Sequence, residues 1–452
     1  MSSFIKGIKN YFVKSRLSKR ERILLNLNIR PYPLKDDIKD IHFNTDKIHA
    51  LPLSFEDIDD DFTDIGDLGW LGPVAKETKV FMMGVTHYLK YIFNLRTRIF
   101  FALNKIDYFP FIILEYQYSK TPFVNYYLNL KDDNAANHYF VNVLDDFITT
   151  REELVLLNHI RRWNKLHADK PLKIGYSDIE FHYEFTFEKI LIPFFKKMES
   201  SIDFKVGQGL SPKLIDDLKK LQKKAEKNGL VGDFPFITPG YIKNVISNIE
   251  SFYNAQTYDF THYRQKAIIR NLTDKDILGL DLTKGKTMIS SGANHVPSNF
   301  KFPEQGAFLC EGSFLSHNFE PTKGKTFSVA ALGFSCCLGD NPDMGTDFPP
   351  GLSNEYIYIL KRMRDAVEKK MISPRKYYNI FRNPHDFEIL LVKKAYEHNH
   401  KPLLLDNIPW DDITETFPDQ SKITFAIKDY YSRFDRVIFV PRSPLISTRK
   451  KI

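Results

Sequence analysis

Four side chains in the first third of the sequence have types that could carry out hydrolysis: His87, Arg96, Arg98 and Glu115. An imidazole has a pKa near neutrality and can take a proton from an attacking water. A carboxylate can orient that imidazole, and a guanidinium group can stabilise an oxyanion that forms on a carbonyl group. These residue types together predict activation of water.

The segments around these residues predict one strand–helix–strand unit. The apolar run Val80–Met83 indicates a buried strand that stops at Gly84, just before His87. A helix with both arginines would follow, and a second apolar strand over 109–115 ends on Glu115. In open α/β sheets ligands bind at the carboxyl ends of parallel strands, so we expect these side chains at one edge.

The rest of the chain predicts an α/β fold with a central, mostly parallel sheet, flanked by helices on both faces. Further strands alternate with helical segments, which is typical of this class. Between 186 and 272 the apolar periodicity is helical, and we expect an all-helical insertion there. The predicted strands are 172–178, 286–296, 326–334, 401–406 and 435–440. The predicted parts are a basic amphipathic extension (1–50), the α/β core (51–192 and 263–452) and the helical insertion (193–262).

Two local predictions concern helices. The acidic run Phe55–Phe62 suggests a solvated helix ahead of the first strand. Thr149 or Thr150, followed by two glutamates, predicts the capped start of a helix.

The charge of the chain is unevenly distributed. The formal net charge is +8, but residues 1–22 contain seven basic residues and one acidic residue, and three more basic residues lie at 449–451. Because the remainder is close to neutral, a basic surface for nucleic acid is not expected. We expect a small molecule as the partner, and the sequence does not predict an oligomeric state.

Composition indicates a folded protein of a reducing compartment. The three cysteines, Cys310, Cys336 and Cys337, form neither a disulfide framework nor a metal-binding spacing. The N-terminus has no continuous apolar segment of the kind found in signal peptides, so we expect a cytoplasmic location. Residues 4–13 place apolar side chains on one helical face among lysines. Such a helix can lie on a membrane surface or pack on its own domain.

An ordered series of short motifs resembles the erythromycin esterase family. The resemblance covers roughly residues 55–445, although each motif alone is weak. The matching positions are Gly84–His87, Arg96, Glu115, Asn125–Tyr126, Arg162–Asn164, Gly175, Asp178, Arg264, Asn271, Asn294–Val296, Leu405–Asp406 and Phe434–Asp435.

The resemblance implies a metal-independent hydrolase without a cofactor, acting on an ester or lactone. It implies His87 as the general base and Arg96, Glu115 and His295 as its pocket partners. By the same resemblance we expect four substrate-binding residues, which are Arg98, Asp178, Arg264 and Asn294. No Gly-x-Ser-x-Gly elbow is present, which disfavours an acyl-enzyme route.

The chain departs from the family at two positions. The family has Gly-Glu-x-x-His at the first motif, and this chain has no glutamate there. Either Gly84 occupies the position of the glutamate, or that position is deleted. The first histidine of the later His-Asn-x-His motif is Gly292 here. We expect the two glycines to enlarge the cavity, and we do not expect macrolide hydrolysis.

Three alternatives remain open. The chain could be a relative that has lost catalysis and binds a ligand in the same cleft. It could be a metal-dependent hydrolase of the related Gly-x-x-His type, for which His87, Glu115 and His295 could supply ligands. It could also be a membrane-surface protein that attaches through residues 1–22.

Overall fold

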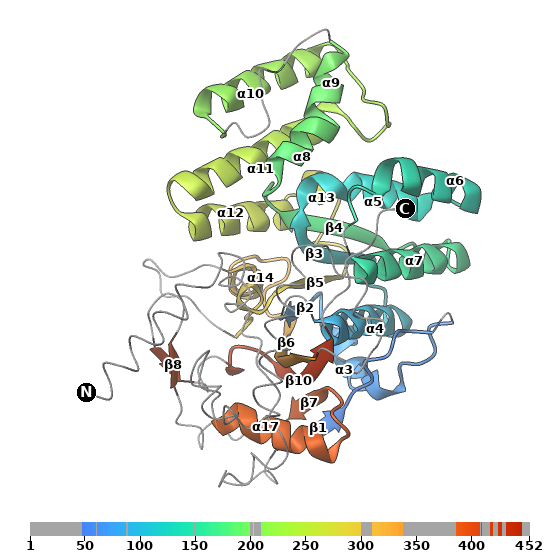
Figure 1. Cartoon of the computed structure of the whole chain (residues 1–452), viewed down its shortest axis with the longest axis vertical. Coiled ribbons are helices and arrows are strands. Elements are labelled where there is room, and N and C mark those ends of the chain that lie inside the picture. Colours follow the sequence, from blue (N-terminus) through green and yellow to red (C-terminus); the bar gives the residue numbers. More distant parts are fainter. Residues whose placement is uncertain are drawn as a thin grey trace, which may run out of the picture.

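A computed structural model describes most of the α/β core and the helical region (Figure 1). The described residues are 48–59, 61–86, 89–148, 150–198, 202, 209–299, 310–337, 386–406, 408, 416–418, 424–426 and 431–444. Residues 1–22, His87 and Thr149 therefore lie outside the described residues.

The centre of the molecule is an eight-stranded sheet with the strand order β1-β7-β10-β6-β2-β5-β3-β4. The strands from β10 to β4 are parallel. At one edge β7 pairs antiparallel with β10, and β1 pairs antiparallel with β7. The predicted mostly parallel sheet is confirmed. The strands are β1 (His49–Pro52), β2 (Val80–Val85), β3 (Phe111–Gln117), β4 (Lys173–Asp178), β5 (Thr287–Gly292), β6 (Thr326–Cys337), β7 (Leu403–Asp406) and β10 (Arg436–Pro444), with β8 (Thr416–Pro418) and β9 (Thr424–Ala426) forming a separate pair.

Burial on both faces explains why the central strands are continuous apolar runs. All six residues of β2 are buried. Strands of a parallel sheet covered by helices on both sides lack the polar alternation of half-exposed strands. The predicted strand at Val80–Met83 follows from this pattern, and β2 pairs with β5 and β6 over its whole length.

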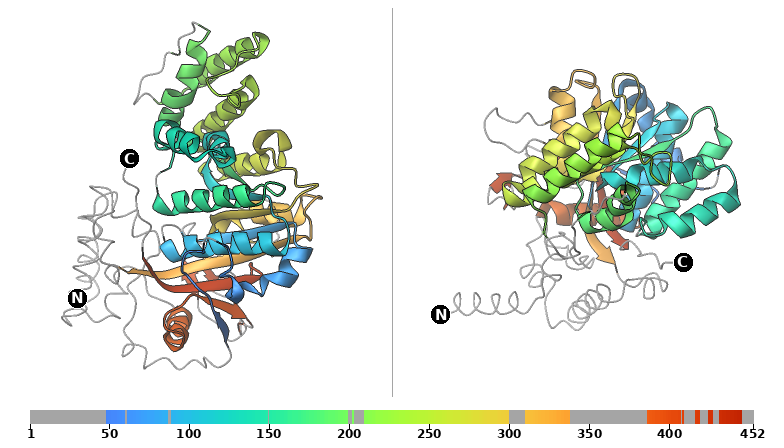
Figure 2. Two further views of the ribbon diagram at one scale, coloured as in Figure 1. Left: turned by 90° about the vertical axis from the view of Figure 1, so that its right-hand side faces the viewer. Right: turned by 90° about the horizontal axis from the view of Figure 1, so that it is seen from above.

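Helices cover both faces of the sheet (Figure 2). On one face α4 packs on α3 and α7, and on the other α12 packs on β4 and α14. The helices of these layers are α3 (Leu71–Glu77), α4 (Lys90–Ile106), α5 (Thr121–Asn129), α6 (Asp133–Tyr139), α7 (Arg151–Leu166), α12 (Phe260–Thr273), α13 (Lys275–Leu278), α14 (Glu311–His317) and α17 (Asp386–Glu397).

Further helices extend beyond the β4 edge of the sheet (Figure 1). Helix α11 packs on both α10 and α12, so α10 is joined to the core through two helical layers. The domain boundaries that we derived from the sequence, including 193–262 for the insertion, stay a prediction. The helices of this region are α8 (Tyr183–Thr186), α9 (Ile192–Lys196), α10 (Pro212–Lys227) and α11 (Pro239–Thr257), and two π-helical turns, η5 (Phe140–Leu144) and η6 (Phe187–Leu191), lie close to it.

One predicted helix cap is present and one predicted helix is not. Thr150 Oγ1 accepts a hydrogen bond from Glu153 N at 3.2 Å, which caps α7. The described residues of the acidic run 55–62 contain no helix, so that prediction is wrong. Phe62 has a positive φ of 56° and is buried, because its ring packs 4.5 Å from that of Phe101.

Among the described helices, none combines the length and the apolar character that a bilayer crossing requires.

Candidate functional site

Two carboxylates lie at the carboxyl edge of neighbouring strands. Glu115 is near the end of β3, and Asp178 is the last residue of β4. The two strands pair in parallel, so their carboxyl ends meet at the same edge. This edge is where open α/β sheets bind ligands.

Arg264 of α12 joins these carboxylates. Its Nε lies 3.0 Å from Asp178 Oδ1, and its Nη2 lies 2.6 Å from Asp178 Oδ2. Nη2 also donates to Glu115 Oε1. Burial lowers the pKa of Arg264, but Asp178 and Glu115 outweigh burial and raise it. Arg264 therefore stays cationic and compensates two buried carboxylates.

The second oxygen of Glu115 is held by the neighbouring strand β5. Oε2 accepts from Ser291 Oγ at 2.9 Å and from the backbone N–H of Gly292 at 2.5 Å. Because both oxygens of Glu115 accept hydrogen bonds, this carboxylate is a fixed negative charge and is poorly placed to act as a base. Gly292 contributes its backbone to the site in place of an imidazole.

His295 completes the group from the short turn η7 (Ala293–His295), which follows β5. Its Nε2 lies 3.1 Å from Arg264 Nη1 and 3.6 Å from Glu115 Oε1. Its Nδ1 lies 3.2 Å from Glu311 Oε2, at the start of α14. The Arg264 cluster is the name used below for Glu115, Asp178, Arg264, His295 and Glu311.

The charges around His295 determine its protonation. Burial lowers the pKa of this imidazole, and the carboxylates of Glu311 and Glu115 outweigh burial and raise the pKa to about 9. Neutral His295 can accept a hydrogen bond from Arg264 through Nε2. Protonated His295 has only donors, so its Nε2 then accepts nothing from Arg264, and the imidazolium forms an ion pair with Glu115 at 3.6 Å. The raised pKa favours the protonated form at neutral pH.

The neighbour of Arg264 on α12 also contacts this imidazole. Gln265 Nε2 lies against His295 Nδ1, and Gln265 Oε1 is buried without a partner in the described chain. If the side-chain amide of Gln265 is rotated by 180°, its Oε1 accepts a hydrogen bond from the Nδ1–H of His295. Neither Gln265 nor Glu311 was predicted from the sequence, because no motif or spacing marks them.

Arg96 lies apart from the Arg264 cluster. Its side chain is 3% exposed and packs 4.3 Å from the ring of Phe93. Burial lowers the pKa of Arg96, and the charges that oppose this effect include Tyr116 and Glu153, on the α4 and α7 face of the sheet. Glu115 points to the opposite face and pairs with Arg264, so the structure does not bring Arg96 together with Glu115 and His295 as the resemblance implied.

Arg98 occupies a third location. Its side chain is 0% exposed and forms ion pairs with Asp64 at 3.0 Å and Asp67 at 2.7 Å. These contacts fix the segment before α3, so the position of Arg98 does not support the substrate-binding role expected from the sequence.

Asn294 is exposed on η7, next to His295. His87, the expected general base, lies outside the described residues.

We expected Gly84 to enlarge a cavity, and it does not. A Cβ at this position would lie 2.7 Å from Val296 Cγ2 and 2.9 Å from the Cα of Ala293. The turn η7 is packed directly on the glycine. The missing side chain thus brings η7, and with it His295, close to β2.

The expectation of a metal-independent site rests on the resemblance. Within the described ranges, no group of three or more His, Cys, Asp and Glu side chains is arranged to hold a metal ion.

A pocket of about 450 Å³ lies beside the Arg264 cluster. Phe181 lines this pocket, and its ring centroid is 5.2 Å from Arg264 Cζ. Gln117, two residues after Glu115 on β3, also lines it. We call this space the Lys120 pocket, and its lining residues are Gln117, Lys120, Asp146, Phe181, His182, Tyr183, Glu184 and Phe185.

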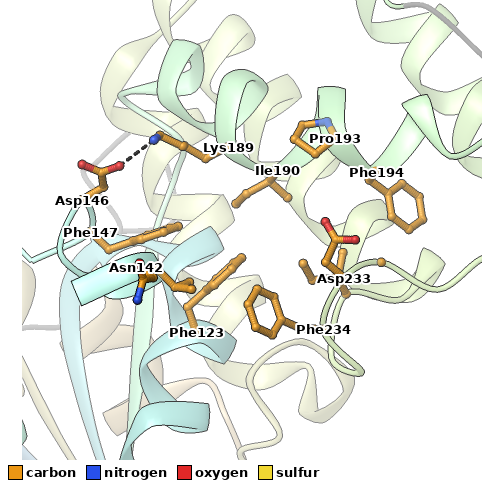
Figure 3. Close-up of a pocket in the computed structure, with 13 residues that line it drawn as sticks. Phe123, Asn142, Asp146, Phe147, Lys189, Ile190, Pro193, Phe194, Asp233 and Phe234 are labelled. Atoms are coloured by element: carbon orange, nitrogen blue, oxygen red, sulfur yellow. Dashed lines mark hydrogen bonds and ion pairs between the residues drawn. The ribbon is translucent and has the colours of Figure 1, made fainter. Parts of the chain in front are cut away.

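A second pocket, of about 210 Å³, lies among aromatic side chains of the helical region (Figure 3). Its walls include Phe123 of α5, Phe194 of α9 and Phe234. At one end Lys189 forms an ion pair with Asp146 at 2.5 Å. Asp146 borders both pockets.

The sequence has no match among models of known protein families or among curated proteins. Solved structures with a similar fold share little sequence with this chain. A protein from Bacillus cereus is 16% identical, with a TM-score of 0.52 over 90% of this chain and 100% of that chain. A succinoglycan biosynthesis protein is 14% identical, with a TM-score of 0.50 over 91% and 98% of the two chains. An erythromycin esterase variant in its open conformation is 12% identical, with a TM-score of 0.45 over 84% and 95%. At these identities the similarity concerns the fold alone.

Proposed function

We propose that this chain is a hydrolase that cleaves an ester or lactone of a small molecule at the Arg264 cluster. The observation that carries the proposal is the convergence of Glu115, Asp178, Arg264 and His295 from four elements at the carboxyl edge of the sheet. Perturbed pKa values that arise from burial and specific charge partners are typical of functional sites. The resemblance in sequence motifs adds His87 as the base.

In the proposed reaction His87 takes a proton from water as the water oxygen attacks the carbonyl carbon. The carbonyl oxygen becomes an oxyanion, and cationic donors at the cluster would stabilise it. Arg264 and protonated His295 are the donors available there, in place of Arg96, to which the resemblance gave a pocket role. When the carbon–oxygen bond to the leaving alkoxide breaks, the alkoxide takes a proton from His87 or His295. One well-placed donor of this kind contributes about 3 to 4 kcal/mol in known hydrolases.

The buried carboxylates would hold these donors in place. Glu115 is fixed by Ser291 and Gly292, and Asp178 forms two hydrogen bonds with Arg264. Their charges favour the cationic forms of Arg264 and His295 before any substrate arrives. This is electrostatic preorganisation, in which the charges are oriented when the protein folds and need not reorient during the reaction.

A second candidate function is ligand binding without catalysis. It is favoured by one observation, which is that the guanidinium group of Arg264 is already surrounded by other groups of the Arg264 cluster. Each nitrogen of the Arg264 guanidinium group contacts Glu115, Asp178 or His295. A substrate oxyanion would have to compete with these contacts.

A screen of aryl esters, alkyl esters and lactones with the purified chain separates the two functions. We expect at least one compound to be hydrolysed, and His87→Ala to reduce its kcat by 100-fold or more, since general-base catalysis contributes 10²–10⁴-fold. His262→Ala is the matched control, because His262 is an exposed residue of α12 near Arg264. Equal rates for the wild type and His87→Ala on every hydrolysed compound would refute the proposal. Binding without turnover in both proteins would favour the second function.

A further inference from the structure

Lys120 is a buried lysine at the carboxyl edge of the sheet. Burial lowers its pKa, and the charges of Glu153 and Glu180 oppose this effect. It ends the turn η4 (Tyr118–Lys120), which follows β3 and leads into α5. The residue is 9% exposed and lines the pocket of about 450 Å³ described above. Lysine is rarely buried to this extent unless it has a partner or a function.

The hydrogen-bonding capacity of Lys120 is mostly unused. In the described part of the chain, Nζ makes one hydrogen bond, to the carbonyl oxygen of Phe147 at 2.8 Å. No carboxylate of the described residues lies within 4.0 Å of Nζ. The ring of Tyr116 lies 5.8 Å away and contributes a weak cation–π contact. An ammonium group has three donors, so two remain for a ligand.

The surrounding carboxylates do not accept hydrogen bonds from these two donors of Lys120. Glu180, which acts on Lys120 from a distance, accepts hydrogen bonds from Ser119 N, Ser119 Oγ and Thr186 Oγ1, each at 2.8 Å. Glu153, the other carboxylate that acts on Lys120, accepts from the hydroxyl of a buried tyrosine on β4.

Two acidic side chains and a histidine also line the pocket. Asp146 is neutralised by its ion pair with Lys189 at 2.5 Å. Glu184 adds a negative charge near the start of α8. Burial and the charge of Lys120 both lower the pKa of His182, so this imidazole is neutral at pH 7 and can donate one hydrogen bond.

We infer that Lys120 is an anion-binding residue, and that the substrate carries an acidic group, such as a carboxylate, that the ammonium of Lys120 holds. The part of this inference that concerns the substrate rests on the proposed hydrolase function. The anion site itself does not. Phe181, which lines the Lys120 pocket, lies 5.2 Å from Arg264 of the cluster, so the pocket and the proposed reaction centre are neighbours. Burial without an ion pair costs free energy in the free protein, and an anionic ligand offsets that cost.

Benzoate and its neutral analogue benzamide test the anion site by titration calorimetry with the whole chain. We expect the wild type to bind benzoate at least tenfold more tightly than benzamide, and Lys120→Met to lose this preference. Lys286→Met is the matched control. Lys286 also donates to main-chain carbonyl groups and lies near a phenylalanine ring, but it precedes β5 at the opposite edge of the sheet.

Equal affinities of the wild type for benzoate and benzamide would overturn the inference, and so would a preference that survives in Lys120→Met. If Lys120→Met does not fold, Lys120→Arg replaces it. This variant keeps the positive charge and should keep the preference for benzoate, and loss of affinity for benzoate alone would contradict the inference.

Three esters then locate the acidic group in the substrate: phenyl acetate, 4-carboxyphenyl acetate and monophenyl succinate. The second carries the acid on the leaving group and the third carries it on the acyl group. We expect one acidic ester to exceed phenyl acetate at least tenfold in kcat/KM, and this advantage to disappear in Lys120→Met. Benzoate binding that depends on Lys120, without hydrolysis of any ester, refutes the hydrolase proposal and leaves the anion site. Equal kcat/KM values for the acidic esters and for phenyl acetate would refute the inference about the substrate.

Discussion

Replacing Glu311 by glutamine should lower the pKa of His295 and reduce the stability that this imidazole contributes. Of the charges that raise the pKa of His295, Glu311 has the largest effect and Glu115 the next. Raising the pKa from 6.5 to about 9 favours the protonated folded state by about 3 kcal/mol, and the side chain is buried enough for this value to apply. Glu311→Gln keeps the size of the side chain and removes its charge.

The sign of the pH dependence follows from linkage. Because the pKa is higher in the folded state than in the unfolded state, the contribution is complete below about pH 6.5 and is lost as the pH rises toward 9. The wild type should therefore lose stability over this interval relative to His295→Asn. Glu311→Gln should lose less than the wild type does, and Glu115→Gln should lie between them.

Urea denaturation between pH 6 and 9.5 measures these differences, and NMR titration of the imidazole measures the pKa directly. Comparing variants at each pH removes the contribution of other titrating groups, such as Lys120. Identical dependence of stability on pH in the wild type, His295→Asn and Glu311→Gln would refute the electrostatic reasoning. A pKa of His295 below 6.5 in the wild type would refute it as well, because burial would then outweigh the carboxylates.

Two further predictions concern packing and an ion pair. Gly84→Ala should destabilise the fold by about 1 to 3 kcal/mol in urea denaturation, because its Cβ would lie 2.7 Å from Val296 Cγ2. Gly72→Ala, whose Cβ would have no atom within 4 Å, should change stability little, and equal effects of the two substitutions would contradict this account. Arg98→Met should lower stability by about 1 to 3 kcal/mol through loss of two ion pairs, without changing the KM for any ester that the wild type hydrolyses. A changed KM would restore the substrate-binding role first expected for Arg98.

The central strands could be predicted because they are buried on both faces. Apolar runs bounded by turn residues identified the strand at Val80–Met83, the strand of Glu115, which continues to Gln117, and the strand that ends at Asp178. The rule that parallel strands present their carboxyl ends at one edge then placed these acids and His295 close together. This part of the site follows from topology and needs no side-chain detail.

The pairing of the charges could not be predicted, because it depends on which face of a strand each side chain occupies. Glu115 and Tyr116 are neighbours in β3, and alternate residues of a strand point to opposite faces. Arg96 lies on the face of Tyr116, and Arg264 lies on the face of Glu115. A shift of one residue would exchange the two arginines, so spacing alone does not decide between them.

The short strand β1 affects how the molecule behaves toward copies of itself. In the described part of the sheet it is the outermost strand, and it pairs with β7 alone. A long flat edge would offer unpaired amide and carbonyl groups as a template for aggregation. This edge has four residues, and the last, Pro52, has no amide hydrogen to donate. A short proline-ended border of this kind discourages strand-by-strand assembly between molecules.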